Sequence, residues 1–231
     1  MSKSDNNNID YKKILSAISY DMRNSLTLMF QSLQTIANQP QATKTLSGDE
    51  LSDINYQVQR LNGNLTQLMA LYNVEEDRLM INSTDELVSD VIETAVFQND
   101  LYTQSKGIQI NINVEDELHW CLDRDLIAYL IDDVLSNAIR YSTAAIDIDV
   151  KILDQKLYIA ISDDSSGYPE KMIEAAAAPI NDLASQFGRM GIGLLFSKLI
   201  VLSHNNYGDN GELILQNDGK LGGSTFTIVL P

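Results

Sequence analysis

Two long segments near the N-terminus repeat apolar residues at the spacing of an amphipathic helix, and this pattern constrains the fold more than any other feature of the chain. In residues 9–39 the apolar positions lie three or four residues apart and are Leu15, Ile18, Met22, Leu26, Met29, Leu33 and Ile36. A second series has the same spacing and consists of Leu51, Ile54, Val58, Leu61, Leu65 and Leu68. Each series predicts a long helix with one apolar face, of the kind found in helical bundles.

The segment between the two series predicts a turn. Pro40 ends the first helical pattern, and Ser47-Gly48-Asp49-Glu50 has the form of a capping box, which predicts the start of the second helix. One hairpin buries two apolar faces poorly, whereas two hairpins form a four-helix bundle. We therefore expect residues 1–82 to form a helical hairpin dimerisation domain and the protein to be a homodimer.

After residue 82 the pattern changes to alternating helical and strand-like segments. Ser83-Thr84-Asp85-Glu86 has the form of another capping box and predicts a helix that runs to about Lys106 and ends at Gly107. Alternating apolar residues predict strands near 108–112, 145–152, 156–162, 212–216 and 224–230, with helices at 123–141 and 191–204 and a loop-rich region at 163–190. Antiparallel strand pairs interleaved with helices predict an α+β sandwich over residues 83–231, with helices on one face of a sheet.

The charge of the chain restricts its partners. Its 32 acidic and 16 basic side chains give a net charge of −16, and a field of that sign repels nucleic acid and anionic membrane surfaces. The apolar runs are far shorter than the roughly 20 residues of a membrane span. A single cysteine excludes an internal disulfide. We expect a cytoplasmic protein with no nucleic-acid partner and no membrane insertion.

Four motifs of the second half occur in an order typical of one family of ATP-binding domains. Residues 133–142 read D-V-L-S-N-A-I-R-Y-S, residues 161–169 read I-S-D-D-S-S-G-Y-P, residues 188–194 read G-R-M-G-I-G-L and residues 222–231 read G-G-S-T-F-T-I-V-L-P. They resemble the N box, the two glycine boxes and the closing strand of the histidine kinase ATP-binding domain, whose fold is shared with gyrase, Hsp90 and MutL. The resemblance implies an α/β sandwich that binds ATP and Mg²⁺.

The resemblance implies roles for residues of the N box and the first glycine box. Asn137 takes the place of the Mg²⁺ ligand, and Arg140, one turn later, that of a phosphate contact. Asp133 holds a catalytic position where the family more often has Asn or Glu. Asp163 takes the place of the carboxylate that accepts a hydrogen bond from the adenine amino group, and Gly167 matches the second glycine of that box.

The second glycine box and the closing strand supply the remaining candidates. The resemblance implies that Gly191 and Gly193 let the phosphates approach the backbone at a helix start, where amides and the helix dipole favour anions. It places Arg189 in the lid over the nucleotide and Thr225 beside the adenine.

This chain departs from the family pattern at two places in the ATP site. Ser165 replaces the first glycine of D-x-G-x-G, and the lid, about residues 175–190, is short and lacks the F-x-P-F pattern. If the backbone at Ser165 required a positive φ, the substitution would cost roughly 1–2 kcal/mol. We expect binding of ATP and Mg²⁺ to be weaker than in a typical member, or lost.

The phosphoacceptor position carries the largest departure. Residues 19–24 read S-Y-D-M-R-N, which resembles the phosphoacceptor box of histidine kinases, where a histidine follows the serine. Tyr20 stands there instead, between two apolar positions, so its ring is expected to point outward. A phosphotyrosine ester is far more inert than the P–N bond of phosphohistidine. The sequence thus predicts a degenerate family member that acts in two-component signalling by binding a response regulator receiver domain or a partner histidine kinase.

Three alternatives remain open. Asp21 and Asn24 keep the D/E-x-x-T/N pattern that the family uses to dephosphorylate response regulators, so a dedicated phosphatase with Asn24 orienting the attacking water is one of them. The second is a tyrosine autokinase acting on Tyr20. The third is an ATPase that retains the gyrase-like fold without a role in signalling.

Overall fold

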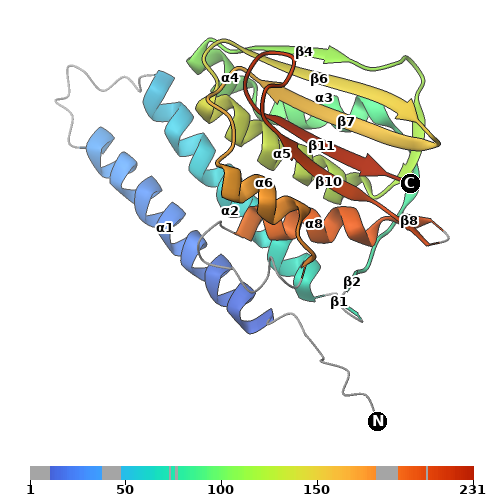
Figure 1. Cartoon of the computed structure of the whole chain (residues 1–231). Coiled ribbons are helices and arrows are strands. Elements are labelled where there is room, and N and C mark those ends of the chain that lie inside the picture. Colours follow the sequence, from blue (N-terminus) through green and yellow to red (C-terminus); the bar gives the residue numbers. More distant parts are fainter. Residues whose placement is uncertain (1–10, 38–47, 73, 76–77, 181–191, 207) are drawn as a thin grey trace.

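The computed structural model describes residues 11–37, 48–72, 74–75, 78–180, 192–206 and 208–231. Within these ranges the chain forms two helices, α1 (Tyr11–Ala37) and α2 (Gly48–Tyr72), followed by an α/β domain. Helices α1 and α2 lie side by side, with α2 against the α/β domain (Figure 1). Both helices were predicted from the apolar repeat. No described helix combines the length and the apolar character needed to cross a membrane.

The predicted apolar face of the hairpin is partly exposed in the single chain. Ile18 is fully buried, but several apolar side chains of the two repeats are exposed, namely Leu15, Leu26 and Leu33 of α1 and Val58 and Leu65 of α2. A row of exposed leucines along a helix pair is a surface that a second helix pair can cover.

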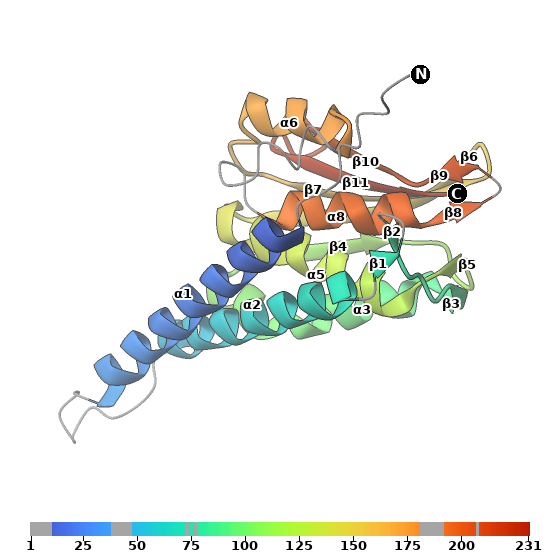
Figure 2. The ribbon, with the colours of Figure 1, turned by 90° about the horizontal axis from the view of Figure 1, so that it is seen from below.

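The α/β domain contains a mixed sheet covered by helices on one face. Its elements in chain order, after the short pair β1 (Val74–Glu75) and β2 (Arg78–Leu79), are β3 (Thr84–Leu87), α3 (Val88–Gln98), α4 (Asp100–Lys106), β4 (Gln109–Asn113), β5 (His119–Leu122), α5 (Arg124–Tyr141), β6 (Ala145–Leu153), β7 (Lys156–Asp163), α6 (Glu170–Ala177), α8 (Ile192–Ser203), β8 (Asn205–Asn206), β9 (Asp209–Asn210), β10 (Glu212–Gln216) and β11 (Thr225–Leu230). The five-stranded sheet has the order β10-β11-β7-β6-β4, and all neighbours are antiparallel except β4 and β6. Helices α3, α5 and α8 lie on the same side of it (Figure 2).

The core lies between the sheet and helices α3, α5 and α8. Helix α5 contributes a fully buried stripe, Leu130, Ile131, Leu135 and Ile139. The side chain of Asp123 caps the helix by accepting the N–H of Leu126 at 3.1 Å, which places the helix start where the sequence predicted it. The turn between β6 and β7 lies between the two strands predicted there, and its residues Asp154 and Gln155 both have positive φ and connect the paired strands directly.

The prediction for residues 83–106 was partly wrong. Thr84–Leu87 is not a capping box but strand β3, which pairs antiparallel with β5. The helix begins at Val88 without a side-chain cap and is interrupted at Asn99, whose buried amide donates to Ala95 O and to Asp132. Pairing with a strand distant in sequence therefore overrides the local capping pattern. The predicted end of the segment is correct, since Gly107 has a left-handed φ of 67°.

The region predicted to be loop-rich contains helix α6. This helix packs beside β10, and its C-terminal end is held to α8 by Lys198, whose buried ammonium donates to the carbonyl oxygens of Ala176 and Ala178. The predicted lid lies mostly in residues 181–191, outside the described residues.

Candidate functional site: a pocket between the sheet domain and the hairpin

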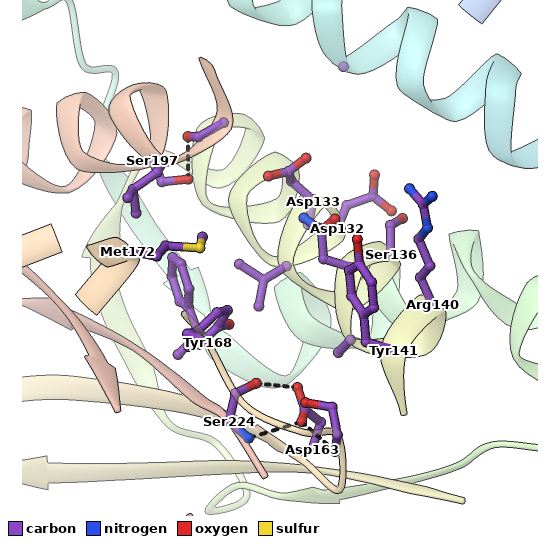
Figure 3. Close-up of a pocket in the computed structure, with 18 of the residues that line it drawn as sticks. Asp132, Asp133, Ser136, Arg140, Tyr141, Asp163, Tyr168, Met172, Ser197 and Ser224 are labelled. Carbon is purple, nitrogen blue, oxygen red and sulfur yellow. Dashed lines mark hydrogen bonds between the residues drawn. The ribbon is translucent and has the colours of Figure 1, made fainter. Parts of the chain in front are cut away.

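A pocket of about 620 Å³ is enclosed by α2, α5, the loop after β7 and the start of α8. Figure 3 shows Asp163 and Ser224 at one end of it and Asp132 and Asp133 at the other. Its wall between these ends is apolar and includes Val134, Ala138, Tyr168, Met172, Leu194 and Phe226. Burial in this wall raises the pKa of Tyr168 to about 12. An apolar slot with polar groups at its ends suits a flat, partly polar ligand.

One end of the pocket is built around the carboxylate of Asp163, the last residue of β7. Its Oδ1 accepts the N–H groups of Ser165 and Ser224 at 2.9 and 3.0 Å, and its Oδ2 accepts the hydroxyl of Ser224. Gly223 permits this arrangement, because a Cβ there would lie 2.5 Å from Asp163 O and from Ser165 N. The carboxylate is thus fixed and buried, and an ionised carboxylate has capacity for a further donor such as an exocyclic amine.

The loop after Asp163 depends on Gly167. Its φ of 86° favours glycine, and a Cβ there would lie 2.6 Å from Oδ1 of Asn217, an atom that accepts the N–H of Tyr168. Ser165 does not have a positive φ, so the strain considered for this substitution does not arise. Its hydroxyl instead accepts the N–H of Gly167 at 3.1 Å. The serine is therefore compatible with the loop.

Thr225 does not take the place expected from the sequence. Its hydroxyl lies 3.0 Å from that of Ser162, and the residues that line the pocket are its two neighbours, Ser224 and Phe226. Successive side chains of a strand point to opposite faces, so a shift of one residue moves the polar contact from Thr225 to Ser224. Strand alternation was the signal that could have identified Ser224.

Helix α5 brings three predicted residues to the other side of the pocket. Asp133, Asn137 and Arg140 lie one turn apart and all line it. Burial, together with neighbouring Asp132, raises the pKa of Asp133 to about 6, while Arg60 opposes the shift. Arg140 extends toward α2, where it donates to the hydroxyl of Tyr56 at 3.5 Å.

The donor set at this end fits Mg²⁺. Asn137 offers a neutral amide oxygen, since its amide nitrogen donates to Asp133 O at 2.9 Å. Carboxylates of Asp132 and Asp133 lie on the neighbouring turn, and hard oxygen ligands are those that Mg²⁺ prefers. Asn137 would hold the ion, and a nucleotide's phosphates would complete its shell.

The start of α8 closes this end of the pocket. A Cβ on Gly193, in the first turn of α8, would lie 3.3 Å from Oδ2 of Asp133, so the glycine lets the helix start approach α5. The N–H groups of a helix start favour anions. Gly191 and Arg189 lie outside the described residues.

Of the three predicted hairpin residues, only Asp21 reaches the pocket. Tyr20 is 64% exposed, as its place in the repeat predicted, and Asn24 is half-buried, but neither lines the pocket. Asp21 does line it, and it pairs with Arg60 of α2 at 2.8 Å.

The contribution of α2 to the pocket was not predicted from the sequence. Five residues of this helix line the pocket, namely Tyr56, Arg60, Gly63, Asn64 and Gln67. A signal was present in the sequence, because Gln57, Arg60, Asn64 and Gln67 follow each other at spacings of three, four and three and so form a polar face.

Comparison with known proteins identifies the second half of the chain. Residues 122–231 match the family model of histidine kinase-, DNA gyrase B-, and HSP90-like ATPases. Among curated proteins, sensor histidine kinase WalK of Bacillus subtilis is 24% identical over 237 residues, which are 95% of this chain and 36% of WalK. Adaptive-response sensory kinase SasA of a Synechococcus strain is 26% identical over 96% of this chain and 60% of SasA. The chain thus spans between a third and three fifths of the length of these two relatives.

Solved structures show the same fold over both parts of the chain. The histidine kinase AdeS of Acinetobacter baumannii superimposes with a TM-score of 0.60 at 20% identity, over 91% of this chain and 96% of that one. Histidine kinase ThkA, in complex with response regulator protein TrrA, gives a TM-score of 0.57 at 17% identity, over 94% of this chain and 60% of that one. The family match places residues 122–231 among the histidine kinase-, DNA gyrase B-, and HSP90-like ATPases, and the curated sensor kinases, which align along nearly the whole chain, support assignment of the protein to the sensor histidine kinases.

Proposed function

We propose that the chain is a two-component signalling protein that binds ATP and Mg²⁺ in the pocket and acts by binding a response regulator receiver domain or a partner histidine kinase. The observation that supports nucleotide binding is the fixed, buried carboxylate of Asp163 at the end of an apolar slot. A carboxylate in this position favours a ligand with an amine donor. A ligand without a donor would leave one hydrogen-bond acceptor of the buried carboxylate unused.

Tyr20 supports a binding role over phosphate relay. It is exposed on α1 at the position where the family carries its histidine, and a phenol ester does not pass phosphate to a carboxylate as a phosphoimidazole does. Asp21, the first residue of the D-x-x-N pattern, is engaged by Arg60 at 2.8 Å. That ion pair favours partner binding over the dedicated phosphatase, in which the acidic residue would face a docked regulator.

We also propose that two copies associate through the exposed apolar side chains of the hairpin. Leu26 and Leu33 of α1 and Val58 and Leu65 of α2 are exposed in one chain, and their burial would stabilise a four-helix bundle. This retains the division into a dimerisation hairpin, residues 1–82, and an ATP-binding domain, residues 83–231.

The test of nucleotide binding is calorimetric titration of the full chain with ATP and Mg²⁺. The wild type is expected to bind, and Asp163→Asn is expected to lose binding, because the amide presents a donor where the adenine amine needs an acceptor. Asp116→Asn, at an exposed position, is the control for the loss of one negative charge. An Asp163→Asn variant with wild-type affinity would remove Asp163 from the site.

The test of signalling is mixing the protein with phosphorylated and unphosphorylated receiver domains. Binding without transfer of phosphate from ATP is the expected result. Phosphate appearing on Tyr20 or on the receiver would contradict the proposal. Faster decay of the receiver phosphate that is lost in Asn24→Ala would establish the phosphatase instead.

A further inference from the structure

Helix α2 buries its polar face and exposes apolar residues, which is the reverse of an ordinary surface helix. Gln57, Asn64 and Gln67 are buried and Arg60 is half-buried, and three of these four, Arg60, Asn64 and Gln67, line the pocket. Leu65, on another face of the helix, is exposed. Polar side chains that are buried against a pocket indicate that a polar ligand binds there.

Besides Oε1 of Gln57, which does not line the pocket, two buried polar atoms of α2 have no partner among the described residues. They are the amide nitrogen of Asn64, which is 5% exposed, and the amide oxygen of Gln67, which is 3% exposed. The other end of Gln67 donates to the hydroxyl of Tyr129 at 2.6 Å, so that side chain is held in place. Buried polar atoms in folded proteins are nearly always hydrogen-bonded, so an unpartnered donor at the pocket wall points to a ligand that accepts.

The charges of the pocket lining also indicate that phosphates would bind at the edge formed by α2. The described lining carries four carboxylates, Asp21, Asp132, Asp133 and Asp163, and two cations, Arg60 and Arg140. A nucleotide's phosphates add several negative charges, so both arginines are needed to hold them. Arg60 is next to the phosphate end, since it acts electrostatically on Asp133, the residue that faces Gly193 at the start of α8.

We infer that Arg60 and Asn64, one turn apart on α2, form a phosphate clamp, so that the nucleotide is held between the ATP-binding domain and the chain's own hairpin. This inference rests on the proposed binding of ATP. In the structure Arg60 pairs with Asp21 at 2.8 Å, and the phosphates would take over that cation. Asn64 would donate its unpartnered N–H to a phosphate oxygen. Nucleotide binding and docking of the hairpin are then thermodynamically linked, each favouring the other.

The test compares binding of ATP with Mg²⁺ and binding of adenosine, which lacks phosphates, by calorimetry on the full chain. Arg60→Gln is expected to weaken ATP binding about tenfold or more and Asn64→Ala several-fold, as is usual for hydrogen bonds to a charged group. Adenosine affinity stays unchanged in both. Asp21→Asn is expected to strengthen ATP binding a few-fold, because it releases Arg60 from its partner.

Matched controls come from the same hairpin. Arg23→Gln removes an exposed arginine of α1, and Asn62→Ala an exposed asparagine of α2; neither lines this pocket, and both keep wild-type affinity. A second readout is hydrogen exchange of the amides of residues 48–72. Added ATP is expected to slow it in the wild type and to have no such effect in Arg60→Gln.

The outcomes separate this inference from the proposed function. Wild-type ATP affinity in both Arg60→Gln and Asn64→Ala would overturn the clamp and leave ATP binding intact. Equal weakening of ATP and adenosine would also overturn it, because the residues would then shape the pocket rather than bind phosphate. A wild type that binds neither ligand would overturn the proposed function and the clamp together.

Discussion

The sheet domain, which is the α/β domain described above, and the hairpin of α1 and α2 differ in how far they bury their apolar side chains. In the sheet domain the apolar stripe of α5 is completely covered, and Ile131 has no exposed surface. In the hairpin, Leu65 is 47% exposed while Asn64, its neighbour in sequence, is buried. The sheet domain therefore covers its apolar core within one chain, whereas the hairpin leaves apolar side chains exposed and buried polar atoms without partners among the described residues. On our proposals, a second copy would cover the apolar face, and the phosphates of a nucleotide would bind the polar face.

The same contrast holds between the two ends of the pocket. At the adenine end, Asp163 receives its hydrogen bonds from Ser165 and Ser224 of the same domain. At the hairpin edge, Asn64 and Gln67 keep unpartnered polar atoms. The end at Asp163 is preformed, whereas on our proposal the hairpin edge would be completed by the ligand.

The largest effect on stability is expected in the covered core. Ile131→Ala removes a side chain without exposed surface, so the free energy of unfolding should fall by about 2–5 kcal/mol. Urea unfolding followed by circular dichroism measures the change. The graded variant Ile131→Val should lose about 0.5–1.5 kcal/mol. A loss below that of the valine variant would mean that the core around α5 is looser than the structure shows.

A smaller effect is expected at the loop that carries the preformed end of the pocket. Gly167→Ala places a Cβ at a φ of 86° and 2.6 Å from Oδ1 of Asn217, so it should cost about 1–3 kcal/mol of stability and weaken ATP binding. Gly208→Ala is the control, because its φ of 100° brings similar strain but a Cβ there meets no atom within 4 Å. Equal effects of the two variants on stability and on ATP affinity would show that the contact with Asn217 plays no part.

Local sequence signals predicted much of the fold. The helices α1, α2 and α5 and the β6–β7 turn follow from periodicity, from the cap at Asp123 and from turn residues, all of which act within a few positions. The motifs also predicted that Asn137 and Asp163 would line one pocket. Strand β3 was missed because its pairing with β5 joins segments more than thirty residues apart along the chain.

The hairpin's part in the pocket was missed for a related reason. Arg60 and Asn64 look like solvated polar residues until it is known which face of α2 packs against α5. That choice is a tertiary one, which the periodicity of a single helix does not decide.

A pH-dependent effect on stability, intermediate in size, is expected where the start of α5 meets the end of α8. His204 is buried, its Nε2 accepts the N–H of Asp123 at 3.1 Å, and burial lowers its pKa. The unfolded chain then binds more protons than the folded one, so stability is lost as the pH falls through the ordinary histidine pKa of about 6.5. His204→Gln should cost about 1 kcal/mol at pH 8.

The pH series distinguishes titration from simple loss of packing. The gap between the wild type and His204→Gln should narrow from pH 8 to pH 5.5, because only the wild type carries this buried imidazole. His119→Gln, at an exposed position, is the control for the loss of a histidine. A gap of constant size would show that His204 contributes through packing alone.

The smallest effect on the single chain, and a large one on the pair, is expected at Leu65. Because the side chain is half exposed in one chain, Leu65→Ala should change the unfolding of a dilute monomer by no more than about 0.5 kcal/mol. In a dimer that covers the hairpin's apolar face the same side chain would be buried, and its loss from both copies should raise the dimer dissociation constant by about tenfold or more. Sedimentation velocity over a concentration series measures this, with Asn62→Ala on the same helix as the control. Association of Leu65→Ala identical to that of the wild type would place the interface elsewhere, and a wild type that stays monomeric at every concentration would mean that the exposed leucines do not pair two copies of this chain.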